Sequence, residues 1–509
     1  MSVAIREDYQ ATPSYAFDRP EETTLGRAFA PDQARHGDLS GFRLLQGGVG
    51  ALMTRAALAD LAERAIDLKY FIYEPDETGA FLLEKLIAAA ERGVRVRILL
   101  DDYALGFEDL YLAQIVDEHP LIEIRVFNPL SDRSRWSRPL QIALHLDRLG
   151  MRMHNKVFAV DSQVAILGGR NISNRYFEAR AESHFRDLDV LAAGPIVRDV
   201  SRQFDEYWNS PLAVPVSAFV APSQARSTTQ RLAELHRLAA AEHGPHAEYA
   251  QRKEVFLGRL LKGDPEMVWA KGTVVSEVPV RELPDQARSA RSLSEISRTL
   301  AIERQAVKYE LVMVMAYYVP GARGVEVMSE LTRRGVRVRI LTNSLAATDV
   351  LAVHAGYSRY RAALLATGVE LHEYRPDAQR PAREGHLMRH GDSDSALHAK
   401  VIVYDRRLIW VGSANSDPRS RRLNTEGGFL IESAPLAERL LARIEDDFSF
   451  QHSWRLALES GQESGKKQIV WSGMQDGRLV RLHEEPGADL MRQFRAWFYS
   501  LMPGLEDLL

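Results

Sequence analysis

Two copies of one short motif, 244 residues apart, hold most of the side chains in this sequence that could perform chemistry. Each copy reads H-x-K-x₄-D and is followed by an asparagine at the same spacing. The residues are His154, Lys156, Asp161 and Asn171 in the first copy, and His398, Lys400, Asp405 and Asn415 in the second. Two histidines, two lysines and two asparagines in equivalent positions suit chemistry on a phosphodiester.

Phosphoryl transfer spreads negative charge over the equatorial oxygens of the reacting centre, and the lysines and asparagine amides could neutralise that charge without a metal. One imidazole can attack phosphorus and form a covalent intermediate. The other can protonate the leaving alcohol and then deprotonate the incoming one. Histidine suits both roles because its unperturbed pKa lies near neutrality. We therefore expect two histidines that act as a nucleophile and an acid/base.

A carboxylate on the far ring nitrogen of each histidine would fix its tautomer. One candidate follows each motif, Asp187 after the first and Glu426 after the second. Asp189 is a rival to Asp187, but counting back from Pro195 and Pro435 aligns Asp187 best with Glu426. We expect Asp187 and Glu426 to orient the histidines.

In each motif the histidine and the lysine are two residues apart in a sequence that alternates like a strand, so both side chains share one face. Asp161 and Asp405 lie an odd number of residues from the lysine, beside a turn. We expect these two motif carboxylates to brace the structure rather than to touch substrate. A return strand then carries Asn171 and Asn415 back toward the histidine and the lysine.

The repeat extends beyond the motifs. The string Arg-Gly-Val-Arg-Val-Arg-Ile-Leu occurs at Arg92–Leu99 and again at Arg334–Leu341. An apolar strand and an amphipathic helix precede each copy, and another strand follows. This order predicts an α/β fold of two similar lobes, each a mixed β-sheet flanked by helices, whose motifs meet at a shared active-site cleft. The arginines of the strings are expected on a solvated strand face.

The predicted divisions are an irregular N-terminal arm over residues 1–41, a first lobe over 42–210, a connecting insert over 211–267, a second lobe over 268–450 and a tail over 451–509. The tail contains a candidate hairpin over 468–482, with Asp476 and Gly477 at its turn. It ends in an amphipathic helix whose apolar face carries Phe494 and Trp497. Such a helix can lie in a membrane interface, although docking on the core of the protein itself is favoured.

Composition narrows the function classes. The 509 residues include 45% hydrophobic and 26% charged residues, typical of a globular protein, and the net charge of −4 gives no overall basic excess for nucleic acid. The absence of cysteine excludes disulfides, thiolate zinc sites and a cysteine nucleophile. The sequence shows no secretory signal pattern, no transmembrane run and no metal-ligand cluster, so no cofactor is expected.

The duplicated motif resembles the hallmark of the phospholipase D superfamily over roughly residues 42–450. Further strings are similar to the bacterial cardiolipin synthase C branch: Arg152–Lys156, Gly168–Ile172, Asp187–Val190, Asp417–Ser420 and Leu423–Glu426. One departure is Gly169-Arg170, where many relatives have Gly-Ser.

This resemblance implies phospholipase D-type lobes and a metal-independent, two-step phosphatidyl transfer through a phosphohistidine. His154 would be the nucleophile and His398 the acid/base. Phosphatidylglycerol would be the acceptor, with phosphatidylglycerol or phosphatidylethanolamine as the donor and cardiolipin as the product. The resemblance also implies a cytoplasmic protein in peripheral contact with the inner face of the cell membrane.

Three alternatives remain open at this point. A phospholipase D that hydrolyses phospholipids to phosphatidic acid would use the same residues. A nucleic-acid phosphodiesterase would need a basic groove with exposed aromatic side chains, and the sequence shows no such cluster. A non-catalytic lipid-binding module does not require two histidines.

Overall fold

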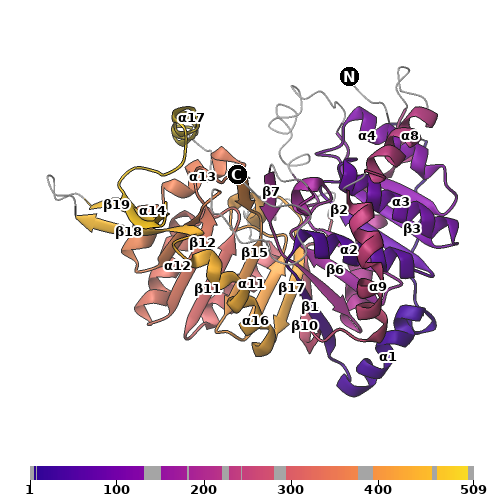
Figure 1. Ribbon diagram of the computed structural model, residues 1–509, viewed down its shortest axis with the longest axis horizontal. Coiled ribbons are helices and arrows are strands. Elements are labelled where there is room, and N and C mark those ends of the chain that lie inside the picture. The colour runs from indigo at the N-terminus through magenta and orange to yellow at the C-terminus, as the bar shows by residue number, and fades with distance from the viewer. Residues whose placement is uncertain are drawn as a thin grey trace. The chain divides into compact units, whose positions relative to one another are not determined.

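The computed structural model divides the chain into two compact units, and each unit contains a short segment from the other half of the sequence. Unit 1 comprises Met1–Ala179, Asp189–Ser292 and Leu423–Phe429, and unit 2 comprises Arg180–Leu188, Leu293–Arg422 and Leu430–Leu509. The residues that the structure describes are 5–6, 8–130, 151–179, 183–220, 228–241, 244–279, 294–376, 394–460 and 467–502. Figure 1 shows the elements coloured along the chain.

Unit 1 is built on a mixed sheet with the order β9–β4–β3–β2–β5–β6–β8–β1–β10, in which β2, β3 and β4 are parallel to one another. The strands in chain order are β1 (Ser40–Leu45), β2 (Ala65–Tyr70), β3 (Arg95–Asp101), β4 (Ile122–Phe127), β5 (Val157–Val160), β6 (Val164–Gly168), β8 (Asp189–Ala193), β9 (Ala213–Pro215) and β10 (Val268–Ser276).

Helices cover both faces of this sheet. The Tyr70 hydroxyl of β2 accepts a hydrogen bond from Arg55 of α2. Asp67 of the same strand accepts one from Arg97, and the Arg97 guanidinium also donates to Asp205 of α7. Since Asp67 and Tyr70 are an odd number of residues apart, α2 and α7 lie on opposite faces. Figure 1 shows α2, α3 and α9 side by side. The helices are η1 (Pro20–Glu22), α1 (Thr24–His36), α2 (Gly48–Leu61), α3 (Glu77–Glu91), α4 (Phe107–Asp117), η2 (Asn174–Tyr176), α7 (Ile196–Trp208), η3 (Val216–Ala218), α8 (Thr228–Ala239) and α9 (Pro245–Lys262).

The N-terminal arm is not irregular as predicted, because α1 occupies residues 24–36 of it. The Thr23 side chain caps this helix by accepting a hydrogen bond from the Gly26 amide. Two helices, α8 and α9, fill the predicted insert and belong to unit 1. That residues 42–210 and 268–450 fold as two separate lobes stays a prediction.

Unit 2 repeats the central strand order of unit 1. Its sheet runs β20–β19–β18–β13–β12–β11–β15–β16, so β13–β12–β11–β15–β16 corresponds to β4–β3–β2–β5–β6. The parallel and antiparallel pairings also correspond, which confirms the duplication. The strands are β11 (Glu310–Met315), β12 (Arg337–Asn343), β13 (Glu370–Tyr374), β15 (Lys400–Tyr404), β16 (Leu408–Gly412), β18 (Ser453–Ser460), β19 (Lys467–Gln475) and β20 (Arg478–Leu482). The strand β17 (Gly427–Glu432) begins in unit 1 and ends in unit 2.

A separate two-stranded parallel sheet in unit 2 joins β7 (Ser183–Arg186) to β14 (Asp394–Leu397). The predicted tail hairpin is present as β19–β20, with positive φ at Asp476 and Gly477. The helices of unit 2 are α11 (Glu295–Ala306), α12 (Gly321–Arg333), α13 (Leu351–Ser358), α14 (Arg361–Ala366), α15 (Pro418–Arg422), α16 (Ala434–Ile444), η4 (Glu445–Phe448) and α17 (Leu490–Ser500). Within the described ranges, no helix has the length and apolar character that crossing a membrane requires.

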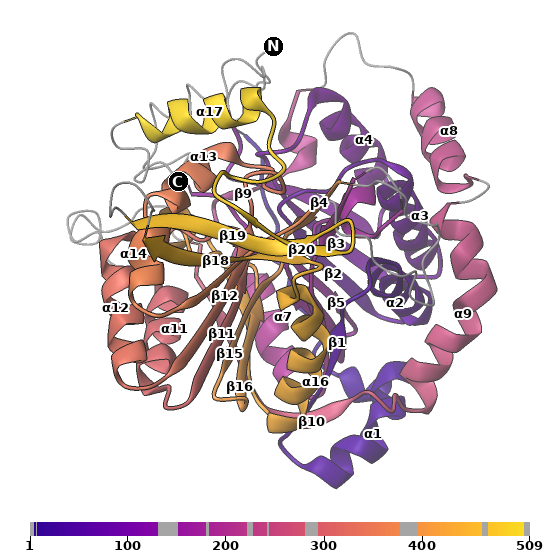
Figure 2. The same cartoon turned by 60° about the vertical axis from the view of Figure 1, so that its left-hand side comes forward.

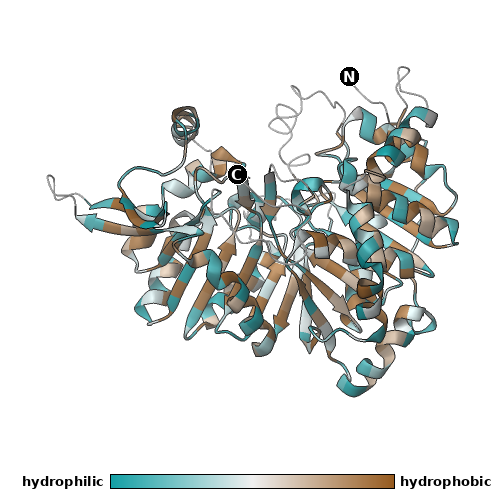
Figure 3. Ribbon diagram, in the orientation of Figure 1, coloured by the Kyte–Doolittle hydropathy of each residue, from teal (hydrophilic) through white to brown (hydrophobic). Residues whose placement is uncertain are grey.

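The cores of both units are the apolar strands, which Figure 3 shows in brown. The prediction of a solvated strand face is wrong for Arg97 and Arg339, which are both buried. Arg97 lies 2.7 and 2.9 Å from the Asp67 carboxylate oxygens, and Arg339 makes two 2.8 Å bonds to Glu445. The helices α7 and η4 cover these strands and supply carboxylates, as a buried guanidinium requires.

Candidate active site

His154 lies just before β5, and His398 lies just before β15. Each unit contains one short segment from the other half of the sequence, which we call its exchanged segment, and this segment is bonded to the histidine of that unit. In unit 1 the His154 amide donates to the Thr425 carbonyl, 2.8 Å away. In unit 2 the His398 amide donates to the Arg186 carbonyl at the same distance. The segments 423–429 and 180–188 therefore build the two half-sites, one in each unit.

Each histidine ring is bonded to a buried carboxylate. His154 Nδ1 lies 2.8 Å from Glu426 Oε2, and His398 Nδ1 lies 2.6 Å from Asp187 Oδ2. A carboxylate accepts a hydrogen bond from the N–H at Nδ1, so the lone pair of the neutral ring is at Nε2. Both rings thus present Nε2 as the nitrogen for nucleophilic attack or proton transfer.

The pairing crosses between the halves of the sequence. Asp187, which follows the first motif, serves the histidine of the second motif, and Glu426 serves the histidine of the first. The rival Asp189 faces elsewhere, with its carboxylate 2.8 Å from the guanidinium of Arg55. Sequence reasoning found both carboxylates but did not predict the crossing.

The motif lysines are buried beside their own histidines. Lys156 Nζ donates to the carbonyl of His154, and Lys400 Nζ donates to the carbonyl of His398. Lys400 Nζ also lies 3.1 Å from Nε2 of the His398 ring. Lys400 therefore lies next to its imidazole, whereas Lys156 bonds to the backbone of its histidine.

Burial lowers the pKa of His398, and the charge of Lys400 lowers it further, while the Asp187 carboxylate acts in the opposite direction. The protonated His398 ring is therefore a stronger acid than free histidine. The same lowering reduces the fraction of His398 that carries this proton near neutral pH, and it favours the neutral ring that can accept one.

The two motif aspartates brace the strands, as the odd spacing predicts. The Asp161 carboxylate accepts hydrogen bonds from three consecutive backbone amides, residues 63–65, and Asp405 does the same with residues 308–310. Each aspartate has positive φ in the turn after its strand. Burial raises the pKa of Asp161 even though these amides oppose the rise. Both side chains hold the chain where β2 and β11 begin.

The two asparagines differ in their bonding. Asn171 Oδ1 accepts from the Ile72 amide at 3.2 Å, and its Nδ2 donates to the Tyr176 hydroxyl at 2.8 Å. Asn415 is also buried, yet its Oδ1 has no hydrogen-bond partner in the described part of the chain. Arg170, the departure noted above, is fully buried and donates to the carbonyls of Leu45 and Gln46. Its side chain is structural.

Two aromatic residues at the half-sites were missed by sequence reasoning. The Phe71 ring centroid lies 5.0 Å from the His154 ring and 5.5 Å from Lys156 Nζ. In unit 2 the Tyr317 ring centroid lies 5.9 Å from Lys400 Nζ. Phe71 is the first residue after β2 and Tyr317 is the second after β11, so alignment of the two halves does not pair them.

The chain was compared with known proteins. The profile of one family, described as cardiolipin synthase, PLD-like domain, matches residues 57–208 and 304–448, more than half of the chain. Cardiolipin synthase C of Escherichia coli (strain K12) is 34% identical over 94% of this chain and 98% of its own length. Cardiolipin synthase B of the same strain is 27% identical over 74% of this chain and 72% of its own length.

Among solved structures, phosphatidylserine synthase from Haemophilus influenzae Rd KW20 is similar, with a TM-score of 0.53 and 14% sequence identity. The match covers 85% of this chain and 91% of the other. At this identity the likeness concerns the fold, and it agrees with the duplicated α/β units. From the matched profile and the full-length relative, the chain belongs to the cardiolipin synthase family of phospholipase D-like proteins.

Proposed function

We propose that this protein is a phosphatidyltransferase that forms cardiolipin from phosphatidylglycerol and a second phospholipid, either phosphatidylglycerol or phosphatidylethanolamine. The observation that carries the proposal is the pair of half-sites, in which the ring of His154 is bonded to Glu426 and the ring of His398 to Asp187. The cardiolipin synthase names of two relatives support the choice of reaction.

In the first step, Nε2 of His154 attacks the phosphorus of the donor lipid. The P–N bond forms as the bond to the head-group oxygen breaks, and protonated His398 gives its proton to that oxygen. Glycerol or ethanolamine leaves, and a phosphatidyl group remains on His154. General acid catalysis of this kind contributes about 10²- to 10⁴-fold in rate.

In the second step, neutral His398 takes the proton of a phosphatidylglycerol head-group hydroxyl. The oxygen attacks phosphorus, the P–N bond breaks, and cardiolipin leaves while His154 returns to its starting state. Every proton that His398 gives in the first step is recovered in the second. Water in place of the lipid alcohol would give phosphatidic acid.

Other residues act around this transfer. Lys156 and Lys400 neutralise charge on the phosphoryl oxygens, and Asn415 together with the second N–H of the Asn171 amide completes the phosphate-binding set. Asp187 and Glu426 are positioning residues that keep each ring in one tautomer. Asp161 and Asp405 act through the backbone, and the proposal needs no cofactor.

For its location, we propose that the protein works in the cytoplasm, in peripheral contact with the inner face of the cell membrane, where its lipid substrates lie. Cardiolipin is a membrane lipid, so the similarity to cardiolipin synthase C supports contact with a membrane.

The test is product analysis of the purified protein with phosphatidylglycerol vesicles, with and without phosphatidylethanolamine. His154→Ala and His398→Ala are the test variants, and His483→Ala, at an exposed position outside both motifs, is the matched control. We expect cardiolipin from the wild type and the control only. If the products include phosphatidic acid but no cardiolipin, the protein is a hydrolase and not a transferase. If no lipid is turned over, both activities are contradicted.

The order of the two histidines has its own test. With phosphorus-labelled lipid, His398→Ala should retain a base-stable, acid-labile label on the protein, whereas His154→Ala should retain none. The reverse result would exchange the two roles.

A further inference from the structure

The last described helix, α17, is fastened to unit 2 through polar contacts. Figure 2 shows it lying beside α13. Arg492 Nε donates to the Leu345 carbonyl at 2.6 Å, and Arg359 donates to the Ser500 carbonyl at 2.5 Å. Ahead of the helix, the Glu485 carboxylate bonds to His354 at 2.7 Å and to Arg361. These contacts fix the orientation of the helix.

In this orientation the apolar face of α17 points to solvent. The prediction that it docks on the core of the protein is therefore wrong, and Ala496 is the buried residue of the helix. Arg492 fastens the polar side instead. The exposed side chains, which we call the α17 stripe, are Leu490 (84% exposed), Phe494 (57%), Trp497 (53%), Phe498 (54%) and Leu501 (59%). Such a concentration of exposed large apolar groups marks an interaction surface.

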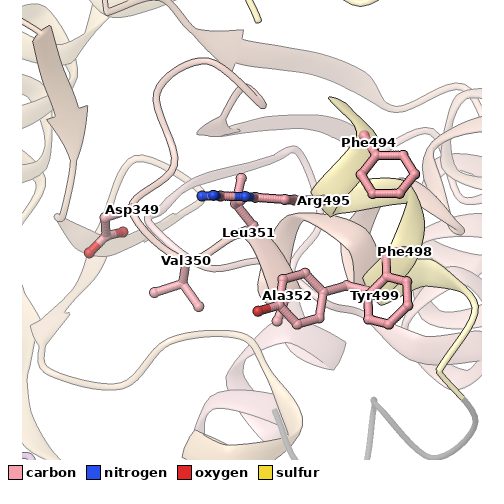
Figure 4. Close-up of a pocket in the computed structure, with 8 residues that line it drawn as sticks. All are labelled: Asp349, Val350, Leu351, Ala352, Phe494, Arg495, Phe498 and Tyr499. Atoms are coloured by element: carbon pink, nitrogen blue, oxygen red, sulfur yellow. The ribbon is translucent and has the colours of Figure 1, made fainter. Parts of the chain in front are cut away.

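The helix also lines a cavity of about 440 Å³ together with the chain at the start of α13. Residues 349–352 form one wall, and residues 494–499 of α17 contribute the other. In Figure 4 the Arg495 guanidinium is directed toward the end of the cavity that holds Asp349, and the rings of Phe494 and Phe498 lie at the α17 end. The cavity thus combines apolar side chains with one cation, Arg495, and one carboxylate, Asp349.

This cavity adjoins the half-site of the same unit. The Tyr317 hydroxyl lies 2.9 and 3.0 Å from the two oxygens of Asp349, and the Tyr317 ring is next to the ammonium of Lys400. The charge of Asp349 also acts on His398, whose pKa it raises. Tyr317 therefore links one wall of the cavity to the half-site of the same unit.

We propose that the α17 stripe and the adjoining cavity are the docking surface for an anionic phospholipid bilayer. The inference rests on the proposed function and adds the surface through which lipid reaches the half-site of unit 2. An amphipathic helix of this kind lies in the plane of the interface, with its apolar face about 5–10 Å deep. Tryptophan and tyrosine are preferred at that depth, and Arg495 complements lipid phosphate.

The experiment is vesicle flotation of the full-length protein with phosphatidylglycerol-containing vesicles. Phe494→Glu and Trp497→Glu each remove a large apolar group and add a repelled charge, so each should weaken binding by about tenfold or more. The matched control is Ile302→Glu on α11 of the same unit, where the isoleucine is 66% exposed and far along the chain from the stripe. It should bind as the wild type does.

Arg495→Gln tests the charge. It should weaken binding to phosphatidylglycerol vesicles and leave the weaker binding to phosphatidylcholine vesicles unchanged. Quenching of tryptophan fluorescence by brominated acyl chains should fall in Trp497→Phe, since Trp497 would lie among those chains. Equal quenching in both proteins would contradict insertion of the stripe.

Wild-type binding by the Glu variants would overturn the docking surface. The docking surface is also overturned if light scattering shows that these variants separate a wild-type dimer while vesicle binding persists, because the stripe would then contact a second copy. Failure of the proposed function is distinguishable. In that case binding depends on the stripe, yet no lipid is turned over, even when short-chain phosphatidylglycerol is supplied as soluble monomers.

Discussion

The half-site of unit 1 and the half-site of unit 2 share one plan and differ in how their asparagines are held. Both histidines are fixed by an exchanged segment, a buried carboxylate and a neighbouring lysine. The amide of Asn171 is bonded to Tyr176 and to the Ile72 backbone, whereas Oδ1 of Asn415 has no partner in the described chain. A buried polar group without a partner requires an explanation, and a substrate is one.

The two asparagines therefore differ in the hydrogen bonds that they make to the protein. Asn171 bonds to the protein through Oδ1, which accepts from the Ile72 amide, and through Nδ2, which donates to the Tyr176 hydroxyl. Among the described residues, Oδ1 of Asn415 is an open acceptor that suits a hydroxyl donor of a lipid head group, beside a histidine whose pKa burial has lowered.

The largest expected effect is the loss of a positioning carboxylate. Asp187→Asn and Glu426→Gln should each lower kcat by about 10³- to 10⁴-fold, because an amide no longer selects the tautomer with its lone pair at Nε2. Asp189→Asn is the matched control: it faces Arg55, so it should lower stability more than the turnover of the folded protein. Steady-state kinetics and urea unfolding separate the two. Equal kcat losses at all three positions would contradict the crossed assignment.

Replacing each asparagine with alanine should affect turnover in one half-site and stability in the other. Asn415→Ala is expected to lower kcat by about 10²- to 10³-fold, because it removes an amide that the proposed function places on the substrate. The free energy of unfolding should change little, since Oδ1 of Asn415 accepts no hydrogen bond from the described chain. Asn171→Ala should cost about 1–3 kcal/mol of unfolding free energy, because it leaves the Ile72 amide and the Tyr176 hydroxyl without their partner. If both variants lose only stability, Asn415 does not bind substrate.

The buried arginines Arg97 and Arg339 differ in the exposure of their partner carboxylates. Arg97→Met leaves Asp67 buried and should destabilise unit 1 by about 3–5 kcal/mol. Arg339→Met should cost at most about 1 kcal/mol, because its partner Glu445 is 61% exposed and water can solvate it. Thermal unfolding measures both, and a larger loss for Arg339→Met would show that burial of the partner does not decide the cost.

The smallest expected effect is a shift in titration. Lys400→Met should raise the pKa of His398, and Asp187→Asn should lower it, because the lysine depresses that pKa and the aspartate raises it. The folded ring resists protonation while the unfolded ring takes up a proton near pH 6.5, so stability falls as the pH drops through that value. Histidine-selective NMR titration, with His398→Ala for assignment, tests the directions. Shifts of the same sign in both variants would disprove this account.

Much of the fold followed from the sequence, because the alternation around Lys156 and Lys400 and the repeated string reflect local periodicity. The carboxylates Asp187 and Glu426 were also found by alignment of the two halves. Their crossed pairing could not be predicted, because two copies with the same local pattern fit either partner equally well. The shared cleft between the lobes stays a prediction.

Other failures have a similar origin in tertiary contacts. Arg97 looks solvated in a strand pattern, and only the packing of α7 brings Asp205 and Asp67 around it. The amphipathic pattern of α17 indicates an apolar face but not what covers it. That outcome depended on Arg492, whose bonds to backbone carbonyls turn the polar side inward.

The exchanged segments also set the timing of activity during biosynthesis. Glu426 follows His154 by 272 residues, so at ordinary translation rates of about 5–20 residues per second the nucleophile emerges roughly 14–54 s before its carboxylate. A nascent chain that already contains the first motif therefore lacks an oriented His154. A fragment released before Glu426 by a ribosome or a protease would be inactive toward membrane lipids, and only a chain that extends past Glu426 becomes reactive.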